Sequence, residues 1–391
     1  MNCLIGVLLI LTIISCFYYC FAIYAAIDFF KNTPPTQKKF LPAVSLLTPI
    51  CGLEWELEAN LISFCQQEYP QYQIIFCLQN SQESCLELLH KVKDKFAHLD
   101  IQIVTNPQAI GNNLKINNLA NALNMAKYDI LVITDSDIQV KSDYLEGIVQ
   151  PLKDDSVGLV TCLYTSLTKG FLAAFEALAI STQFHPRVLT ARKVEGIKYA
   201  FGSTIVIRQK ILAEIGGFLR IADYLADDYQ LGNLVAKLGY QVVLSNYIVA
   251  HRLANVTWGD FLARQSRRAK CIRVERFWGY LGLIVTQGTV ISLILLIATG
   301  LTQWAVWLCL LTWMLRLLMA IIVGVKFLND SVAKKYLILI PIRDIVSFLL
   351  WCYNLVGNQV NWRDYKFELA KGGKLVKIKL LGEVGKQGNL E

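Results

Sequence analysis

An apolar run that ends in two aspartates is the feature that most constrains this chain. Residues 130–133 are all branched aliphatic, the length and composition of a buried parallel strand. Asp135 and Asp137 follow directly, at the edge where open α/β sheets bind ligands. Carboxylates at this spacing can hold one divalent ion together with a diphosphate. A solvated turn also explains an Asp-x-Asp pair, so the motif needs support from the rest of the chain.

The first apolar segment predicts a membrane anchor. The 391-residue chain is 54% hydrophobic and only 17% charged, which is unusual for a soluble domain. Residues 1–27 carry no charged side chain and exceed the roughly 20 residues that span a bilayer. A signal peptide has a basic start and a shorter apolar run. We therefore expect a retained transmembrane anchor over residues 1–30.

The C-terminal region predicts further membrane segments over residues 277–360. Residues 277–315 carry no charge and are long enough for two spans, with a break near Gly300. Residues 336–356 are also apolar but contain Arg343 and Asp344, and charges at membrane depth usually face a bundle or a water-filled cavity. This stretch is therefore expected to be a third span, a re-entrant hairpin or an interfacial helix.

Basic residues predict the orientation in the membrane. Three such groups occur: after the first span, after residues 277–315, and in the tail, residues 361–391. The first group is Lys31, Lys38 and Lys39, the second is Lys326, Lys334 and Lys335, and the third is Arg363, Lys366, Lys371, Lys374, Lys377 and Lys379. The positive-inside rule places these segments and the central domain on the cytoplasmic side, with an even number of C-terminal crossings. The net charge of +8 then reflects membrane-surface basicity. No interleaving of aromatic and basic residues suggests a nucleic-acid partner.

The central region, residues 40–275, is predicted to be one α/β domain. Its first half alternates short apolar runs with helical patterns, which indicates a parallel sheet covered by helices. The expected strands are residues 43–47, 73–78, 101–104 and 130–134. The expected helices between them are residues 57–66, 83–97 and 114–126.

Eight colinear segments resemble membrane-bound glycosyltransferases of the ceramide glucosyltransferase group, which includes bacterial hopanoid-biosynthesis enzymes. They are SLLTPICG (45–52), EYPQY (68–72), GNNLKINNL (111–119), AKYDILVITDSDI (126–138), HPR (185–187), GSTIVIRQKIL (202–212), GG (216–217) and LADDYQLG (225–232). The resemblance implies an α/β GT-A fold, a Rossmann-like mixed sheet, with transmembrane helices at both ends. It also implies a multi-pass protein of the bacterial inner membrane.

The resemblance implies a donor site for a UDP-sugar. Asp135 and Asp137 match the family's Asp-x-Asp position, which binds the sugar diphosphate and a divalent cation, Mn²⁺ or Mg²⁺. Lys115, Asn117 and Asn118 match a Lys-Ile-Asn-Asn element of the nucleotide-binding loop, where they supply donors and one positive charge.

The resemblance also bears on residues outside these two segments. Asp228, in Asp-Asp-Tyr, matches the catalytic base, and a helix N-terminus explains the same acidic pair structurally. His185 is a structural residue or a catalytic-site candidate. Glu83 stands where the family has an aspartate that contacts the nucleotide. Arg267 is expected either to pair with leaving diphosphate oxygens or to join a basic collar for lipid headgroups; Arg268 replaces the tryptophan that the family has beside it.

These observations predict a metal-assisted, inverting transferase. We expect it to move a sugar from UDP-glucose or UDP-N-acetylglucosamine to the hydroxyl of a ceramide- or hopanoid-like membrane lipid. Two alternatives stay open at this point: a processive polysaccharide synthase that shares the catalytic domain, and a non-catalytic membrane protein.

Overall fold

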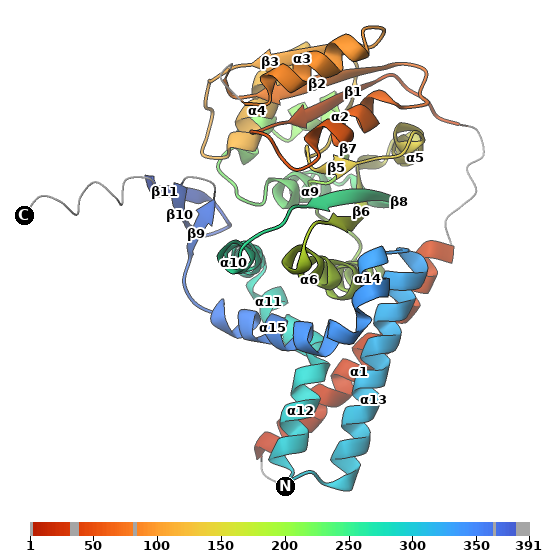
Figure 1. The fold of residues 1–391 in the computed structure, drawn as a ribbon, viewed down its shortest axis with the longest axis vertical. Helices are drawn as coiled ribbons and strands as arrows, with labels where there is room; N and C mark the ends of the chain where they lie inside the picture. Colours follow the sequence, from red (N-terminus) through yellow and green to blue (C-terminus); the bar gives the residue numbers. More distant parts are fainter. Residues whose placement is uncertain (1–2, 32–38, 81–83, 363–364, 381–391) are drawn as a thin grey trace, which may run out of the picture. The chain divides into compact units, whose positions relative to one another are not determined.

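The computed structural model describes residues 3–31, 39–80, 84–362 and 365–380 (Figure 1). Its internal contacts divide the chain into two compact units, which we describe separately.

The first unit, called the sheet unit here, comprises residues 33–167 and 196–254. The second, called the helical unit, comprises residues 1–32, 168–195 and 255–391. Each unit is therefore built from segments that are far apart in the sequence. The domains expected from the sequence are each one continuous segment of the chain, and their bounds stay a prediction.

The sheet unit contains one eight-stranded sheet, in the order β3-β2-β1-β4-β7-β6-β8-β5. Its strands are β1 (Val44–Pro49), β2 (Tyr72–Leu78), β3 (Asp100–Thr105), β4 (Ile130–Ile133), β5 (Ile138–Gln139), β6 (Val157–Thr168), β7 (Ile205–Arg208) and β8 (Gln241–Leu253). All four strands expected from apolar runs form, and they pair in parallel. The remaining half is antiparallel, so the sheet is mixed, as the GT-A resemblance implies.

Burial explains why β4 forms at the centre of the sheet. Every residue of β4 is buried, because strands lie on both of its edges and side chains pack on both of its faces. Val132 pairs with Leu46 of β1 on one side and with Val206 of β7 on the other. These three residues belong to the main apolar core of the unit. The chain that leaves β4 is thereby fixed in position, and it carries Asp135 and Asp137.

Helices of the sheet unit place the other site residues. They are α2 (Leu57–Cys65), α3 (Leu86–Lys95), α4 (Leu114–Ala122), α5 (Tyr144–Val149), α8 (Gln209–Glu214) and α9 (Asp227–Lys237). Helix α4 packs on β1 and β2. The side chain of Asn113 caps its N-terminus by accepting a hydrogen bond from the Ile116 amide, which supplies a partner for one of the unpaired first-turn N–H groups.

The helical unit contains the membrane candidates. Its α-helices are α1 (Cys3–Lys31), α6 (Phe171–Ala179), α7 (His185–Glu195), α10 (Trp258–Glu275), α11 (Phe277–Gly282), α12 (Gly288–Ala298), α13 (Gln303–Ala320), α14 (Ser331–Tyr336) and α15 (Ile340–Tyr353). A π-helical segment, η3 (Ile180–Phe184), joins α6 to α7. Strands β9 (Gln359–Trp362), β10 (Tyr365–Leu369) and β11 (Leu375–Leu380) form a small antiparallel sheet in the region expected as a basic tail.

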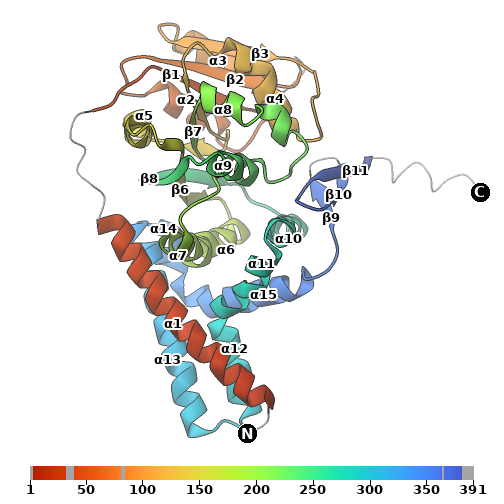
Figure 2. The same cartoon turned by 180° about the vertical axis from the view of Figure 1, so that it is seen from behind.

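Three helices of the described chain are long and apolar enough to cross a membrane: Cys3–Lys31, Gln303–Phe327 and Ser331–Tyr353. A bent pair, Phe277–Thr286 with Gly288–Ala298, turns by 62° and adds a fourth candidate. The expected break near Gly300 is confirmed, since Gly300 and Leu301 both have positive φ between α12 and α13. Helices α1, α12 and α13 run side by side, whereas α15 lies across them (Figures 1 and 2). Whether residues 336–356 form a third span, a re-entrant hairpin or an interfacial helix stays a prediction.

A buried ion pair joins the membrane candidates. The guanidinium of Arg316 on α13 donates to both carboxylate oxygens of Asp344 on α15, at 2.9 and 3.0 Å, and both side chains are less than 5% exposed. Thr289 of α12 and Gln183 of η3 donate further hydrogen bonds to Asp344. Because charges in apolar surroundings require such partners, this cluster fixes how four segments of the unit meet.

We predict that Asp344→Leu destabilises the protein by about 3–5 kcal/mol, because it leaves the Arg316 charge buried and unpaired. The double variant Arg316→Met/Asp344→Leu is expected to recover most of that loss. Thermal unfolding of the detergent-solubilised protein measures both. Glu87→Gln, which removes an exposed i,i+4 partner of Lys91, serves as the control and should behave like the wild type. Equal stability of the single and double variants would contradict this role of the pair.

Candidate active site

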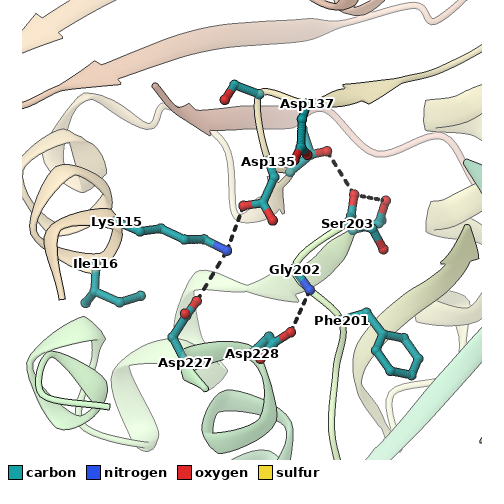
Figure 3. A network of polar contacts seen from close by, with 12 residues as sticks. Lys115, Ile116, Asp135, Asp137, Phe201, Gly202, Ser203, Asp227 and Asp228 are labelled. Carbon is teal, nitrogen blue, oxygen red and sulfur yellow. Dashed lines mark hydrogen bonds and ion pairs between the residues drawn. The ribbon is translucent and has the colours of Figure 1, made fainter. Parts of the chain in front are cut away.

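Lys115 joins two aspartates from distant segments of the sheet unit (Figure 3). Its Nζ lies 2.7 Å from Oδ1 of Asp135, which follows β4, and 3.3 Å from Oδ2 of Asp227, in the first turn of α9. The lysine side chain is only 16% exposed. The sequence predicted Lys115 and Asp135 as site residues, and the structure brings them into direct contact.

Negative charge exceeds positive charge in this cluster. Burial opposes the charged ammonium of Lys115, yet the carboxylates of Asp135 and Asp227 raise its pKa above the ordinary value. The pKa of Asp135 is also raised, by burial and by Asp137, although Lys115 acts in the opposite direction. The raised pKa of Lys115 follows from several carboxylates facing one ammonium, whereas the raised pKa of Asp135 follows first from burial and then from the neighbouring carboxylate of Asp137. A further cation would therefore stabilise the ionised carboxylates of this site.

Asp137 faces a histidine that the sequence did not single out. Nε2 of His251, on β8, lies 3.0 Å from Oδ2 of Asp137. Burial acts against the charged carboxylate, but His251 outweighs it and lowers the pKa of Asp137. The neighbouring backbone is fixed as well, because the Arg252 amide donates to the Asp137 carbonyl at 2.8 Å. His251 is 114 residues from Asp137 and has no sequence signal beyond its position in a strand.

Asp228 is held by backbone amides on the other side of the cluster. The Gly202 amide donates to its Oδ2 at 2.9 Å, and the Tyr229 amide donates to its Oδ1 at 2.7 Å. Burial, and next the neighbouring Asp227, raise the pKa of Asp228 to about 6. A carboxylate with this pKa is mostly ionised at neutral pH and can still take up a proton, which are the properties of a general base.

Gly202 is a position where the backbone lies close to the charged groups. A Cβ atom there would lie 2.7 Å from Oδ2 of Asp135 and 3.0 Å from Nζ of Lys115. The Lys115 side chain is flexible in itself, but its ion pairs with Asp135 and Asp227 hold its ammonium in place. Any larger residue at position 202 would therefore displace these charged groups. The glycine therefore has a steric role in addition to its turn.

The two predicted asparagines serve the neighbouring loop. Oδ1 of Asn117 accepts from the amides of Ile110 and Gly111, and its Nδ2 donates to the Gly111 carbonyl. Asn118 donates weakly to the Ile50 carbonyl, at 3.4 Å. Both side chains are buried, so they shape the loop beside Lys115. Contact with a nucleotide stays a prediction for both.

The remaining predicted site residues do not belong to the described sheet unit. His185 opens α7 and Arg267 lies on α10, both in the helical unit, and His185 is fully buried. Their catalytic roles stay predictions. Glu83 lies outside the described residues.

Among the described residues, no group of three or more His, Cys, Asp or Glu side chains is arranged to hold a metal ion. A complete protein cage is not what the Asp-x-Asp hypothesis requires. Magnesium and similar ions are often bound by one or two carboxylates and completed by substrate phosphates and water. Asp135 and Asp137 satisfy that simpler requirement, and both are about one-third exposed.

Comparison with known proteins gives a consistent result. The family described as Glycosyl transferase family 21 matches residues 7–375. Ceramide glucosyltransferase 1 of Caenorhabditis elegans is 25% identical over 380 residues, 95% of this chain and 79% of the relative. Ceramide glucosyltransferase 3 of the same organism is 30% identical over 232 residues, 59% of this chain and half of the relative.

A solved structure shares the fold. Mannosyltransferase PcManGT from Pyrobaculum calidifontis, in complex with GDP-Man and Mn²⁺, has a TM-score of 0.54 with 17% identity, over 90% of this chain and 100% of the other. At this identity the likeness concerns the fold alone. The predicted GT-A fold is confirmed.

Proposed function

The chain belongs to glycosyl transferase family 21 and is a hexosyltransferase, and we propose that it moves glucose from UDP-glucose to the hydroxyl of a ceramide-like lipid. The two Caenorhabditis elegans relatives, both ceramide glucosyltransferases, support this sugar and this acceptor. UDP-N-acetylglucosamine and a hopanoid-like acceptor are the alternatives that the sequence raised. The observation that carries the proposal is the cluster of Lys115, Asp135 and Asp228, whose charges support a donor site with Asp228 as the candidate base.

A divalent cation, Mn²⁺ or Mg²⁺, fits the donor site. Asp135 and Asp137 would hold it, with His251 as a further candidate ligand because its Nε2 is within 3.0 Å of Asp137. The surplus of carboxylates favours a cation, and PcManGT was solved with Mn²⁺ and a nucleotide sugar. When bound, the ion would neutralise charge on the leaving diphosphate. Lys115 would supply a second positive charge for the phosphate oxygens.

Asp228 is assigned as the general base. Its carboxylate accepts the proton of the acceptor hydroxyl while the hydroxyl oxygen bonds to the anomeric carbon of the sugar. The bond from that carbon to the diphosphate breaks in the same step, and the nucleotide diphosphate leaves. With one base and no assigned nucleophile, a single displacement that inverts the anomeric centre is the simplest mechanism. The amides of Gly202 and Tyr229 keep the carboxylate oriented.

The membrane candidates support a lipid acceptor. A lipid hydroxyl is attached to hydrocarbon that prefers the bilayer by about 0.8 kcal/mol per CH₂ group, so the enzyme must work at the membrane surface. The described chain has three helices long and apolar enough to span, and the basic flanks support a cytoplasmic catalytic domain. The resemblance to bacterial hopanoid-biosynthesis enzymes supports a placement in the bacterial inner membrane. A processive synthase is less well supported. Arg268, at the position of the acceptor-binding tryptophan, is ion-paired with Glu176.

We predict that Asp137→Ala removes the metal-dependent part of UDP binding. Isothermal titration with UDP, with and without Mn²⁺, should show a gain in affinity from Mn²⁺ for the wild type and none for the variant. Asp94→Ala, on the exposed face of α3, is the matched control and should keep the gain. An unchanged Mn²⁺ effect in Asp137→Ala would refute the assigned metal position.

We predict that Asp228→Asn abolishes transfer while UDP binding is kept, because an amide cannot accept the hydroxyl proton. The assay uses full-length protein in liposomes with ceramide and UDP-glucose, and mass spectrometry detects the hexosylated lipid.

For the wild type, kcat/KM should fall about tenfold per pH unit below pH 6, because protonation of Asp228 removes the base.

Two outcomes of this assay separate the claims. Turnover of Asp228→Asn near the wild-type rate would eliminate Asp228 as the base. Failure of the wild type to hexosylate ceramide, with transfer to another lipid, would overturn the acceptor but not the reaction type.

A further inference from the structure

The helical unit contains a groove whose lining residues all belong to that unit. It has a volume of about 630 Å³, within the usual range for small-molecule sites, and is formed by α10, α15 and β9. Its walls include Trp258, Leu262, Leu349 and Tyr353, all of which are more than two-fifths exposed. So much uncovered apolar surface indicates a hydrocarbon ligand or a membrane.

The polar part of the groove is positively charged. Arg267 and Lys270 line it, and the residues that line it include no Asp or Glu. The Lys270 ammonium donates to the Gln359 carbonyl at 2.9 Å, a neutral partner that leaves its charge uncompensated. The groove therefore combines apolar walls with two cations, which is complementary to an anionic amphiphile.

Arg267 differs from the neighbouring arginines of α10 in its ion pairing. Arg264 and Arg268 each lie 2.7 Å from a carboxylate oxygen of Glu176, whose side chain is fully buried. One carboxylate thus holds two of the three arginines in this segment of α10. Within the described part of the chain, Arg267 makes no hydrogen bond or ion pair.

The environment of Arg267 strengthens the case for an anionic ligand. Burial, and then repulsion from Arg268, lower the pKa of Arg267 to about 10. A guanidinium that is desolvated and lacks a counterion is unfavourable, and a bound phosphate would relieve it through two parallel hydrogen bonds.

We propose that this groove binds one anionic phospholipid of the surrounding bilayer, with its phosphate on Arg267. Its acyl chain would lie along Leu262 and Leu349. The polar head of a nucleotide matches these apolar walls poorly, whereas α15 belongs to a stretch with the apolar composition of a membrane helix. Sugar transfer is not part of this inference, so the two can fail separately.

Native mass spectrometry of the full-length protein in detergent tests the proposal. The protein is mixed with dioleoyl phosphatidylglycerol or with zwitterionic dioleoyl phosphatidylcholine, and retained lipid is counted. The wild type should retain one phosphatidylglycerol in preference to phosphatidylcholine. Arg267→Gln should weaken that retention by about tenfold or more, the effect of losing a charged hydrogen bond. Arg267→Lys keeps the charge and should keep part of the preference.

The control is Arg276→Gln. Arg276 is 41% exposed, pairs with Glu195 and does not line the groove, so its loss should leave lipid retention at the wild-type level. Leu349→Asp, which places a carboxylate on the apolar wall, should abolish retention even with Arg267 present. Circular dichroism of each variant reports whether the protein is folded, and UDP affinity is measured separately.

Two results would overturn the proposal. In one, a folded Arg267→Gln variant retains phosphatidylglycerol as the wild type does. In the other, it keeps the lipid but loses UDP affinity, which would assign Arg267 to the leaving diphosphate instead.

Discussion

The ion pairs of Lys115 are the interaction on which the sheet-unit site depends. They allow Asp135 and Asp227 to approach one another, although these residues come from segments more than ninety positions apart. Without a cation between them, buried carboxylates repel and take up protons. Lys115 sits in the first turn of α4, which is itself capped by Asn113 and packed on the parallel strands. The fold therefore delivers one positive charge to the place where the strands end.

The two units differ in which charge they leave uncompensated. In the sheet unit carboxylates outnumber the single ammonium, which suits a metal ion and keeps Asp228 near its protonation point. In the helical unit the single carboxylate of Glu176 pairs with two arginines, and Arg267 lies in an apolar groove without an ion-pair partner among the described residues, which suits a lipid phosphate. Each imbalance indicates the chemistry of the ligand that the surface would bind.

Local sequence patterns predicted the first half of the sheet well. Residues 130–134 were expected as a strand and β4 spans Ile130–Ile133, because a short apolar run of branched residues that ends in polar residues is too short for a typical helix and is typical of a buried strand. Strands β5 to β8 were not predicted, since β5 has two residues and the others depend on distant pairing. His251 and Glu176 were missed for the same reason. Their partners lie 114 and about 90 positions away, and a lone polar residue has no periodicity.

The most direct test of the central role of Lys115 is the thermal stability of Lys115→Met at two pH values. The carboxylates facing it would have raised pKa values in the folded variant, so their ionisation costs stability only as the pH rises through those values. The wild-type ammonium stays charged across this range, because its pKa is raised further. The loss of melting temperature relative to wild type should therefore be larger at pH 8 than at pH 5. An equal loss at both pH values, or none at all, would show that Lys115 does not hold the aspartates together.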